Sequence, residues 1–138
     1  MFRKSPLQQY GQVKHNAYAE FASAHEKTLM LFDGAITFLG VAQQAIIRSD
    51  HELKGKKISQ AIAVVNGLKD CLDHSQGELP KNLRDVYEYV VEQLLNANFT
   101  SDVKAIEEVQ SLLKTIRDSW AHIPPDMHNV TSKKSHKK

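Results

Sequence analysis

The chain has 138 residues, of which 41% are hydrophobic and 25% are charged. A single domain of this length buries about two thirds of the surface that its unfolded chain exposes, so a wholly disordered protein is excluded. No run reaches the ~18 consecutive apolar residues of a membrane span, and the first residues do not resemble a secretory signal. The single cysteine, Cys71, cannot form an internal disulfide. We therefore expect a cytoplasmic protein without membrane insertion.

The formal net charge of +2 is unevenly distributed. Four of the 18 basic residues are lysines near the end of the chain: Lys133, Lys134, Lys137 and Lys138. Without them, 14 basic residues face 16 acidic residues, so the rest of the chain is slightly acidic. A nucleic-acid-binding domain usually carries its basic surface on the folded body. We therefore expect no nucleic-acid partner and interpret the lysines as part of a solvated tail.

Residues 1–22 show no sustained period and are expected to form a loosely attached segment. The first helix is predicted from Ser23 to about residue 49, because Ser23 and Glu26 have the spacing of a capping box. Its apolar residues cover most of the circumference, which is typical of a helix surrounded by others, so we expect it to be central. Gly34 interrupts this helix, which favours close approach of a neighbouring helix there.

Three more helices are expected, over about 51–72, from Pro80 to about residue 97, and from residue 103 up to Pro124. In each of them apolar residues recur at three- and four-residue spacings, the pattern of a bundle helix. Proline suits the first turn of the third helix, and Asp102 is placed to cap the fourth.

The fold class is therefore predicted to be all-α. Residues 23–123 are expected to form an antiparallel four-helix bundle, because short turns join helices of similar length. Residues 124–138 contain too little apolar surface to offset the entropy of ordering, so this basic tail is expected to be disordered.

The sequence contains no pattern of a catalytic or metal site. The seven histidines form no pair at the i,i+3 or i,i+4 spacing of a metal site on a helix, and we interpret most of them as solvated. No glycine-rich phosphate loop is present, and no base is placed to activate Cys71. We therefore expect no enzyme, no metal and no cofactor.

The second and third predicted helices carry more apolar width than one bundle seam needs. Such a surplus is typical of a groove that binds a partner's amphipathic helix. The residues predicted to line this groove are Ile58, Ile62, Val65, Tyr87, Val91 and Leu94. For each of them, packing in the core is the alternative interpretation. Tyr10 and Val13 are predicted to cover the groove as a removable cap, or else are incidental apolar residues of a frayed end.

Several motifs together resemble one family. The segment from Met30 to Ile36, M-L-F-D-G-A-I, resembles the M-L-[YF]-D-G-A-I signature of the FliS family of flagellin export chaperones. Ser23-Ala24-His25-Glu26 resembles the S-P-H-E of that family, and Arg117-Asp118-Ser119-Trp120 resembles its R-D-A-W. Asn82-Leu83, with the tyrosines and leucines that follow, resembles another family block. The resemblance extends over about residues 8–122.

This resemblance implies a cytoplasmic chaperone that binds the disordered C-terminal region of flagellin in an apolar groove. It implies that the chaperone prevents premature polymerisation and delivers flagellin to the export gate of the flagellar type III secretion apparatus. It also implies that the N-terminal segment covers part of the groove, so deleting residues 1–20 is expected to tighten binding. The alternative is a helical adaptor or scaffold for another amphipathic segment. The chain is expected to be a monomer, or a weak homodimer through the same groove.

Overall fold

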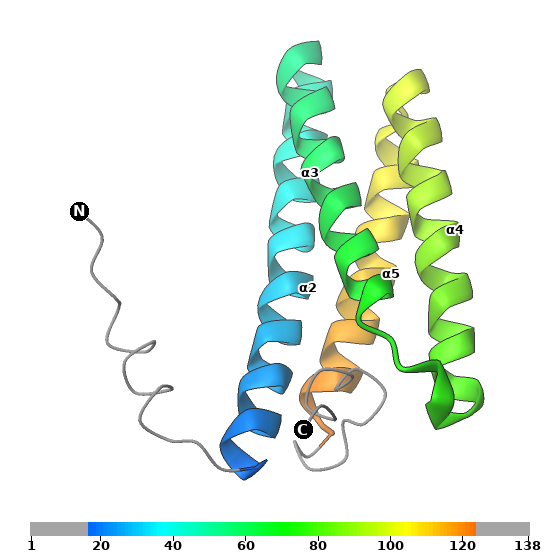
Figure 1. Ribbon diagram of the computed structural model, residues 1–138. Coiled ribbons are helices and arrows are strands. Elements are labelled where there is room, and N and C mark those ends of the chain that lie inside the picture. Colours follow the sequence, from blue (N-terminus) through cyan, green and yellow to red (C-terminus); the bar gives the residue numbers. More distant parts are fainter. Residues whose placement is uncertain (1–16, 124–138) are drawn as a thin grey trace.

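The computed structural model describes residues 17–123, with side chains from residue 23 onward. These residues form four long helices and one short 3₁₀ helix (Figure 1). Their order is α2 (Ala17–Ile47), α3 (His51–Asp70), η1 (His74–Gln76), α4 (Glu78–Thr100) and α5 (Val103–Ala121). Successive long helices run in opposite directions, so the predicted all-α antiparallel four-helix bundle is confirmed.

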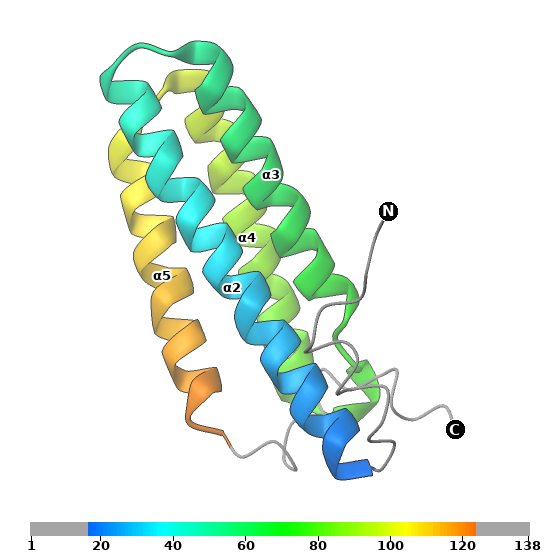
Figure 2. The same cartoon turned by 90° about the vertical axis from the view of Figure 1, so that its left-hand side faces the viewer.

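Each long helix packs mainly against two others, in the cyclic order α2, α3, α4, α5. The prediction that the first helix is central is wrong: α2 occupies one corner of the bundle, between α5 and α3 (Figure 2). Four helices of similar length that surround one shared core leave no central position, because each of them contributes one seam to that core. The apolar residues of α2 outside its seam therefore lie at or near the surface.

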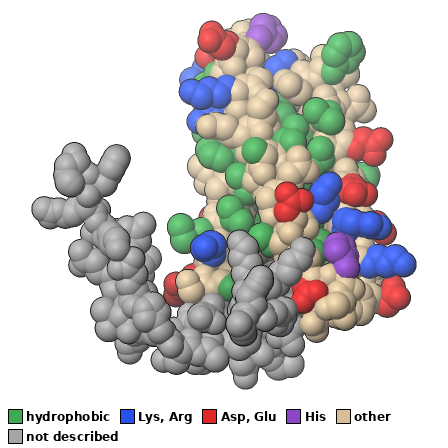
Figure 3. Space-filling view, in the orientation of Figure 1, with side chains coloured by type: hydrophobic (Ala, Val, Ile, Leu, Met, Phe, Trp, Pro, Cys, Tyr) green, Lys and Arg blue, Asp and Glu red, His purple; other side chains and the backbone are tan. Residues whose placement is uncertain are grey.

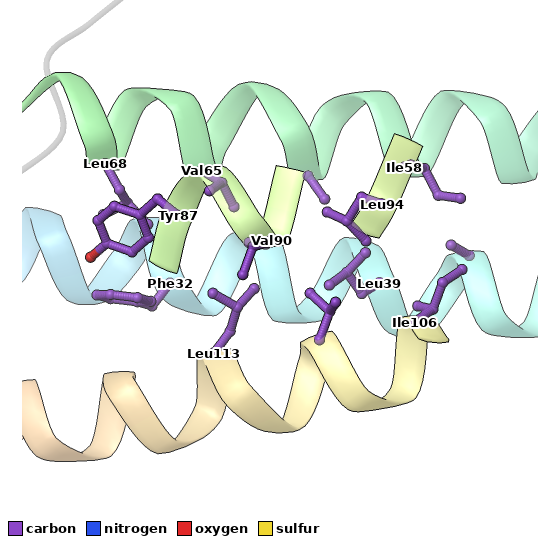
Figure 4. Packing of buried hydrophobic residues seen from close by; sticks show 14 of the residues in the cluster. Phe32, Leu39, Ile58, Val65, Leu68, Tyr87, Val90, Leu94, Ile106 and Leu113 are labelled. Carbon is purple, nitrogen blue, oxygen red and sulfur yellow. The ribbon is translucent and has the colours of Figure 1, made fainter. Parts of the chain in front are cut away.

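The core is built from one buried residue at every third or fourth position of each helix (Figure 4). Its largest fully buried aliphatic and aromatic side chains include Phe32, Leu39, Ile58, Leu72, Leu94, Ile106 and Leu113. The rings of Phe32 and Tyr87 lie 6.4 Å apart between centroids at an angle of 51°, so α2 and α4 meet through an aromatic pair across the core.

The start of the first helix differs from the prediction. α2 begins at Ala17, six residues before Ser23, so Ser23 lies within the helix and does not cap it. Residues 17–22 include three alanines, and alanine has the highest helix propensity of all residues. Because of this propensity, the helix continues through Ser23, although Ser23 and Glu26 have the spacing of a capping box.

Two aspartates cap the N-termini of α3 and α5. Oδ1 of Asp50 accepts a hydrogen bond from the backbone N–H of Leu53 at 3.1 Å, and Oδ1 of Asp102 accepts one from Ala105 at 3.2 Å. The predicted cap at Asp102 is therefore confirmed. Ser101, just before it, has a φ of 55° and ends α4 in the left-handed conformation, which permits the sharp reversal into α5.

One charged side chain is buried where α3 passes the end of α4. Lys54 is 8% exposed, and its Nζ donates hydrogen bonds to the backbone oxygen of Asn98 at 2.9 Å and to Oγ of Ser101 at 2.8 Å. The last carbonyl groups of a helix lack intrahelical donors and carry a partial negative charge. The ammonium group of Lys54 therefore joins α3 to the C-terminus of α4.

Replacing Lys54 with methionine keeps most of the apolar stem and removes the ammonium group. We expect Lys54→Met to lower the free energy of unfolding by about 1–3 kcal/mol, because the Asn98 carbonyl and the Ser101 hydroxyl lose their donor. Urea denaturation measures the change. The matched control is Lys56→Met at an exposed position of α3, which should change stability by less than ~0.5 kcal/mol. Equal effects of the two substitutions would contradict this role of Lys54.

Candidate partner-binding surface

α2 carries more apolar surface than its neighbours cover. The segment Ser23–Ile47 is long and apolar enough to cross a membrane by length and composition, yet only 28% of its most apolar 18-residue window is buried in the bundle. Phe32, Ala35 and Leu39 point into the core and are fully buried. By contrast, Met30 is 65% exposed and Ile47 is 67% exposed. An apolar helix at a corner of the bundle is therefore the first candidate for contact with a partner.

The side of α2 that faces α5 is closed by polar contacts. Nε of Arg117 donates to Oδ1 of Asp33 at 2.9 Å, and its Nη2 donates to Oδ2 at 3.4 Å. This hydrogen bonding raises the pKa of the Arg117 guanidinium. Farther along α2, toward its C-terminus, Nε2 of Gln110 donates to the carbonyl of Ile36 at 2.9 Å, and Gln43 donates to Gln110 at 3.0 Å. These contacts fix α5 against α2 along that side.

His25 strengthens the same contact near the start of α2. Its ring stacks on Trp120, with centroids 6.0 Å apart and an interplanar angle of 21°. Its Nε2 lies 3.2 Å from the backbone oxygen of Trp120, which accepts the hydrogen bond. His25 is partly buried, so the interpretation of the histidines as solvated does not hold for this one.

The side of α2 that faces α3 is more open, and each of the two helices has a glycine there. Phe38 packs there under Nζ of Lys57, 5.1 Å from the ring centroid. No neighbouring atom lies within 4 Å of the position that a Cβ would take at Gly34, or at Gly67 on α3. The predicted close approach of a helix at Gly34 is therefore wrong.

We define the α2–α3 seam as two rows of residues, one from each helix, on the outer side of this contact. Helical spacing places the residues of each row on one face of their helix. The members are Met30, Gly34 and Val41 from α2, Gln60 and Gly67 from α3, and Cys71 at the C-cap of α3. Oε1 of Gln60 is buried and has no hydrogen-bond partner among the described residues. The seam thus combines apolar side chains, open space beside two glycines and one acceptor without a donor.

The opposite side of α3 meets α4. Ile62 and Val91 are partly buried there and pack against the core. An ion pair between Nζ of Lys69 and Oε2 of Glu88, at 3.7 Å, lies on the same side and nearer the η1 end. We call the pair Ile62 and Val91 the α3–α4 seam. Hydrophobic side chains run along the middle of this face of the molecule, with most charged side chains toward its edges (Figure 3).

The residues predicted to line the groove do not lie together on the surface. Ile58, Val65, Tyr87 and Leu94 are at most 2% exposed and belong to the core, so in this conformation they line no groove. Burial also raises the pKa of the Tyr87 phenol, and the nearby Cys71 adds to this shift. For these four residues the alternative interpretation, core packing, describes the structure. The physical reason is that a periodic row of apolar residues defines a helix face but not what that face meets.

The other predicted residues have different positions. Ile62 and Val91 lie at the edge of the core, where a partner can reach them, and their contact with a partner stays a prediction. Tyr10 and Val13 lie outside the described residues. Sequence reasoning missed the α2–α3 seam. The signal in the sequence was Gly34 within an apolar helix, which we interpreted as a close approach of a neighbouring helix.

Metal ligands and the thiol of Cys71 are the other candidates for a functional group. Within residues 17–123, no three His, Cys, Asp or Glu side chains are placed to hold a metal ion. Cys71 is a free, partly exposed thiol on the α2–α3 seam.

Comparisons with known proteins agree on one family. Residues 6–127 match the family described as Flagellar protein FliS. The chain is 39% identical over 127 residues to the flagellar secretion chaperone FliS of Salmonella typhimurium, which covers 91% of this chain and 94% of that protein. It is 37% identical to FliS of Escherichia coli over 87% of this chain and 90% of that protein. With FliS of Vibrio cholerae the identity is 30%, over 94% of this chain and 96% of that protein.

The open space at Gly34 leads to a stability prediction. Gly34→Ala should raise the free energy of unfolding by roughly 0.4–1 kcal/mol, because alanine reduces the entropy of the unfolded chain and its methyl group meets no atom within 4 Å. Thermal or urea denaturation measures the gain. Gly77→Ala is the contrasting control: the φ of Gly77 is +99°, so alanine there should destabilise the protein. Loss of stability in Gly34→Ala would show that the site is not open.

Proposed function

The chain belongs to the FliS family of flagellar secretion chaperones, and we propose that the protein it escorts is flagellin, bound through its disordered C-terminal region. Bound in this way, flagellin is kept from polymerising before export and is handed to a component of the flagellar type III export gate. The proposed role is carried out in the cytoplasm. It consists of binding and requires no catalysis, nucleic acid or membrane insertion.

The observation that carries the proposal is the uncovered apolar surface of α2 beside the open glycines of the α2–α3 seam. A disordered ligand loses ~2–5 kcal/mol or more when it is ordered on binding. It must therefore bury a large surface, as a segment does when it wraps around its partner. Because α3 lies between the two seams, a segment that crosses α3 can contact both of them.

The chemistry of the α2–α3 seam supports a peptide ligand. Apolar side chains of a ligand can fill the space beside Gly34 and Gly67, where a Cβ meets no neighbouring atom. The seam therefore offers a ligand apolar surface and open space to bury.

Calorimetric titration with a peptide from the C-terminal region of a flagellin tests the proposal. We expect a one-to-one complex with a clearly negative heat-capacity change, because apolar surface is buried when the peptide folds onto the bundle. An intact bundle without measurable binding would contradict flagellin as the ligand. The alternative, a helical adaptor for another amphipathic segment, would then be favoured.

Filling the space beside Gly34 tests whether the α2–α3 seam takes part. We expect Gly34→Leu to raise the dissociation constant for the flagellin peptide at least tenfold, because the leucine side chain occupies the space that the ligand needs. The control is Thr115→Leu at an exposed position of α5, away from both seams, which should leave the constant within about twofold. Equal effects of the two variants would argue against the seam while leaving the titration of the parent chain as the test of flagellin binding.

Removal of the predicted cap is a separate test. Because α2 begins at Ala17, the deletion should end at residue 16 so that the helix stays intact. A tethered segment competes at an effective concentration in the millimolar range. If Tyr10 and Val13 cover part of the ligand surface, the shortened chain should bind the flagellin peptide more tightly. The substitutions Tyr10→Ala and Val13→Ala in the full chain should act in the same direction, and unchanged or weaker affinity would contradict the cap.

A further inference from the structure

α4 carries most of the exposed large hydrophobic side chains of the bundle. Six such residues occur among the described residues, and four of them, Leu79, Tyr89, Leu95 and Phe99, lie on α4. Phe99 is 87% exposed and Leu95 is 58% exposed, one helical turn apart. Neither belongs to the two seams defined above. Two large apolar side chains that share one exposed face mark a place where a partner is expected.

These two residues continue a row of carboxylates. Asp85, Glu88 and Glu92 precede Leu95 and Phe99 at spacings of three and four residues, so the five side chains lie on one face of α4. All five are exposed, and residues 85–100 contain no basic side chain. We call this row the α4 stripe. Read from the N-terminus of α4, it presents three carboxylates followed by two apolar side chains. Asp85 is paired with Arg84 at 3.3 Å and Glu88 with Lys69 at 3.7 Å, both at the surface, and Glu92 has no ion pair among the described residues.

We propose that the α4 stripe binds the C-terminal segment, residues 124–138, of a second copy of this chain. In this segment two apolar residues, Met127 and Val130, precede the lysines. Along the sequence, Met127, Val130, Lys134 and Lys137 follow one another at spacings of three and four residues, like the members of the stripe. An antiparallel alignment places Met127 and Val130 on Phe99 and Leu95, and it places the lysines on Glu92 and Glu88. The segment is thus complementary to the stripe in both charge and order.

The same contact does not form within one chain, because the segment leaves the bundle at the wrong end. Ile123 follows α5 at the end of the bundle where α4 begins (Figure 1). Phe99 lies 21 residues along α4 from Glu78, or about 32 Å. Four residues from Ile123 to Met127 reach at most ~14 Å.

A second copy placed alongside in the inverted orientation removes this obstacle. Its segment starts near Phe99 of the first copy and runs back toward Asp85. Pro124 and Pro125 directly follow the last described residue, and proline favours a change of chain direction. The arrangement has two-fold symmetry, so each copy gives one segment and receives one. The lysines also offset the repulsion between the two rows of carboxylates.

Sedimentation equilibrium of the full chain at low and high salt measures the self-association. We expect a dimer whose dissociation constant rises with salt, since exposed charge pairs are screened. The substitution Phe99→Ser should weaken the dimer at least tenfold without changing the fold, because Phe99 is 87% exposed in the bundle. Glu107→Lys with Glu108→Lys on α5 makes the same charge change as a reversal on the stripe and is the control, which should leave the dimer in place. A chain that is monomeric at every concentration would overturn the proposal.

Charge reversal in two full-length variants tests the pairing directly. One variant carries Glu88→Lys and Glu92→Lys on the stripe, and the other carries glutamate in place of the four terminal lysines. Each variant alone should be monomeric, because its stripe and its segment then carry the same charge. An equimolar mixture should form a heterodimer, because each stripe meets a segment of opposite charge. Failure of the mixture to associate would overturn exchange between copies, and so would a dimer that persists in both variants alone.

The test is independent of flagellin binding. The readout is self-association of the chain without ligand, whereas the proposed function is tested by titration with a flagellin peptide. Phe99→Ser should leave the affinity for that peptide within about twofold, because Phe99 lies off both seams. If the two proposals fail, they therefore fail in different measurements.

Discussion

In a bundle of four similar helices, each helix can bury only one seam in the shared core. This constraint decides where the apolar surface of the chain goes. α2 is apolar around most of its circumference, but its place at a corner buries only the row that includes Phe32, Ala35 and Leu39. Polar contacts of Asp33 and Ile36 with α5 close one of its flanks. What remains faces α3 and solvent, and the binding surface is proposed there.

The residues of the segment Met30–Ile36, which resembles the family signature, divide into two groups by their contacts in the bundle. Phe32 and Ala35 fill the core, and Asp33 receives the guanidinium of Arg117 from α5, so these three explain the fold. Met30 and Gly34 serve no packing role among the described residues: Met30 is 65% exposed, and the Cβ position of Gly34 is open. A helix-interior glycine costs about 1 kcal/mol relative to alanine. A partner that occupies the space beside Gly34 would explain why this position holds glycine and not alanine.

The proposed surfaces differ in the interactions by which they would bind a partner. The seams on both sides of α3 are mainly apolar, which suits a ligand that is ordered as it binds. The α4 stripe is exposed and acidic, which suits a basic segment held by charge and two apolar contacts. Salt should therefore weaken self-association more than it weakens flagellin binding.

The sequence by itself determined the helices, because apolar periodicity, Asp102 as a cap and the proline after α5 are local signals. Its motifs also pointed to the family. Only the tertiary structure decided which side of each helix is covered. Ile58 and Ile62 both read as groove residues, yet Ile58 is buried and Ile62 lies at the core edge. The spacing of residues along a helix defines its faces, whereas the partner of each face depends on where the neighbouring helices pack.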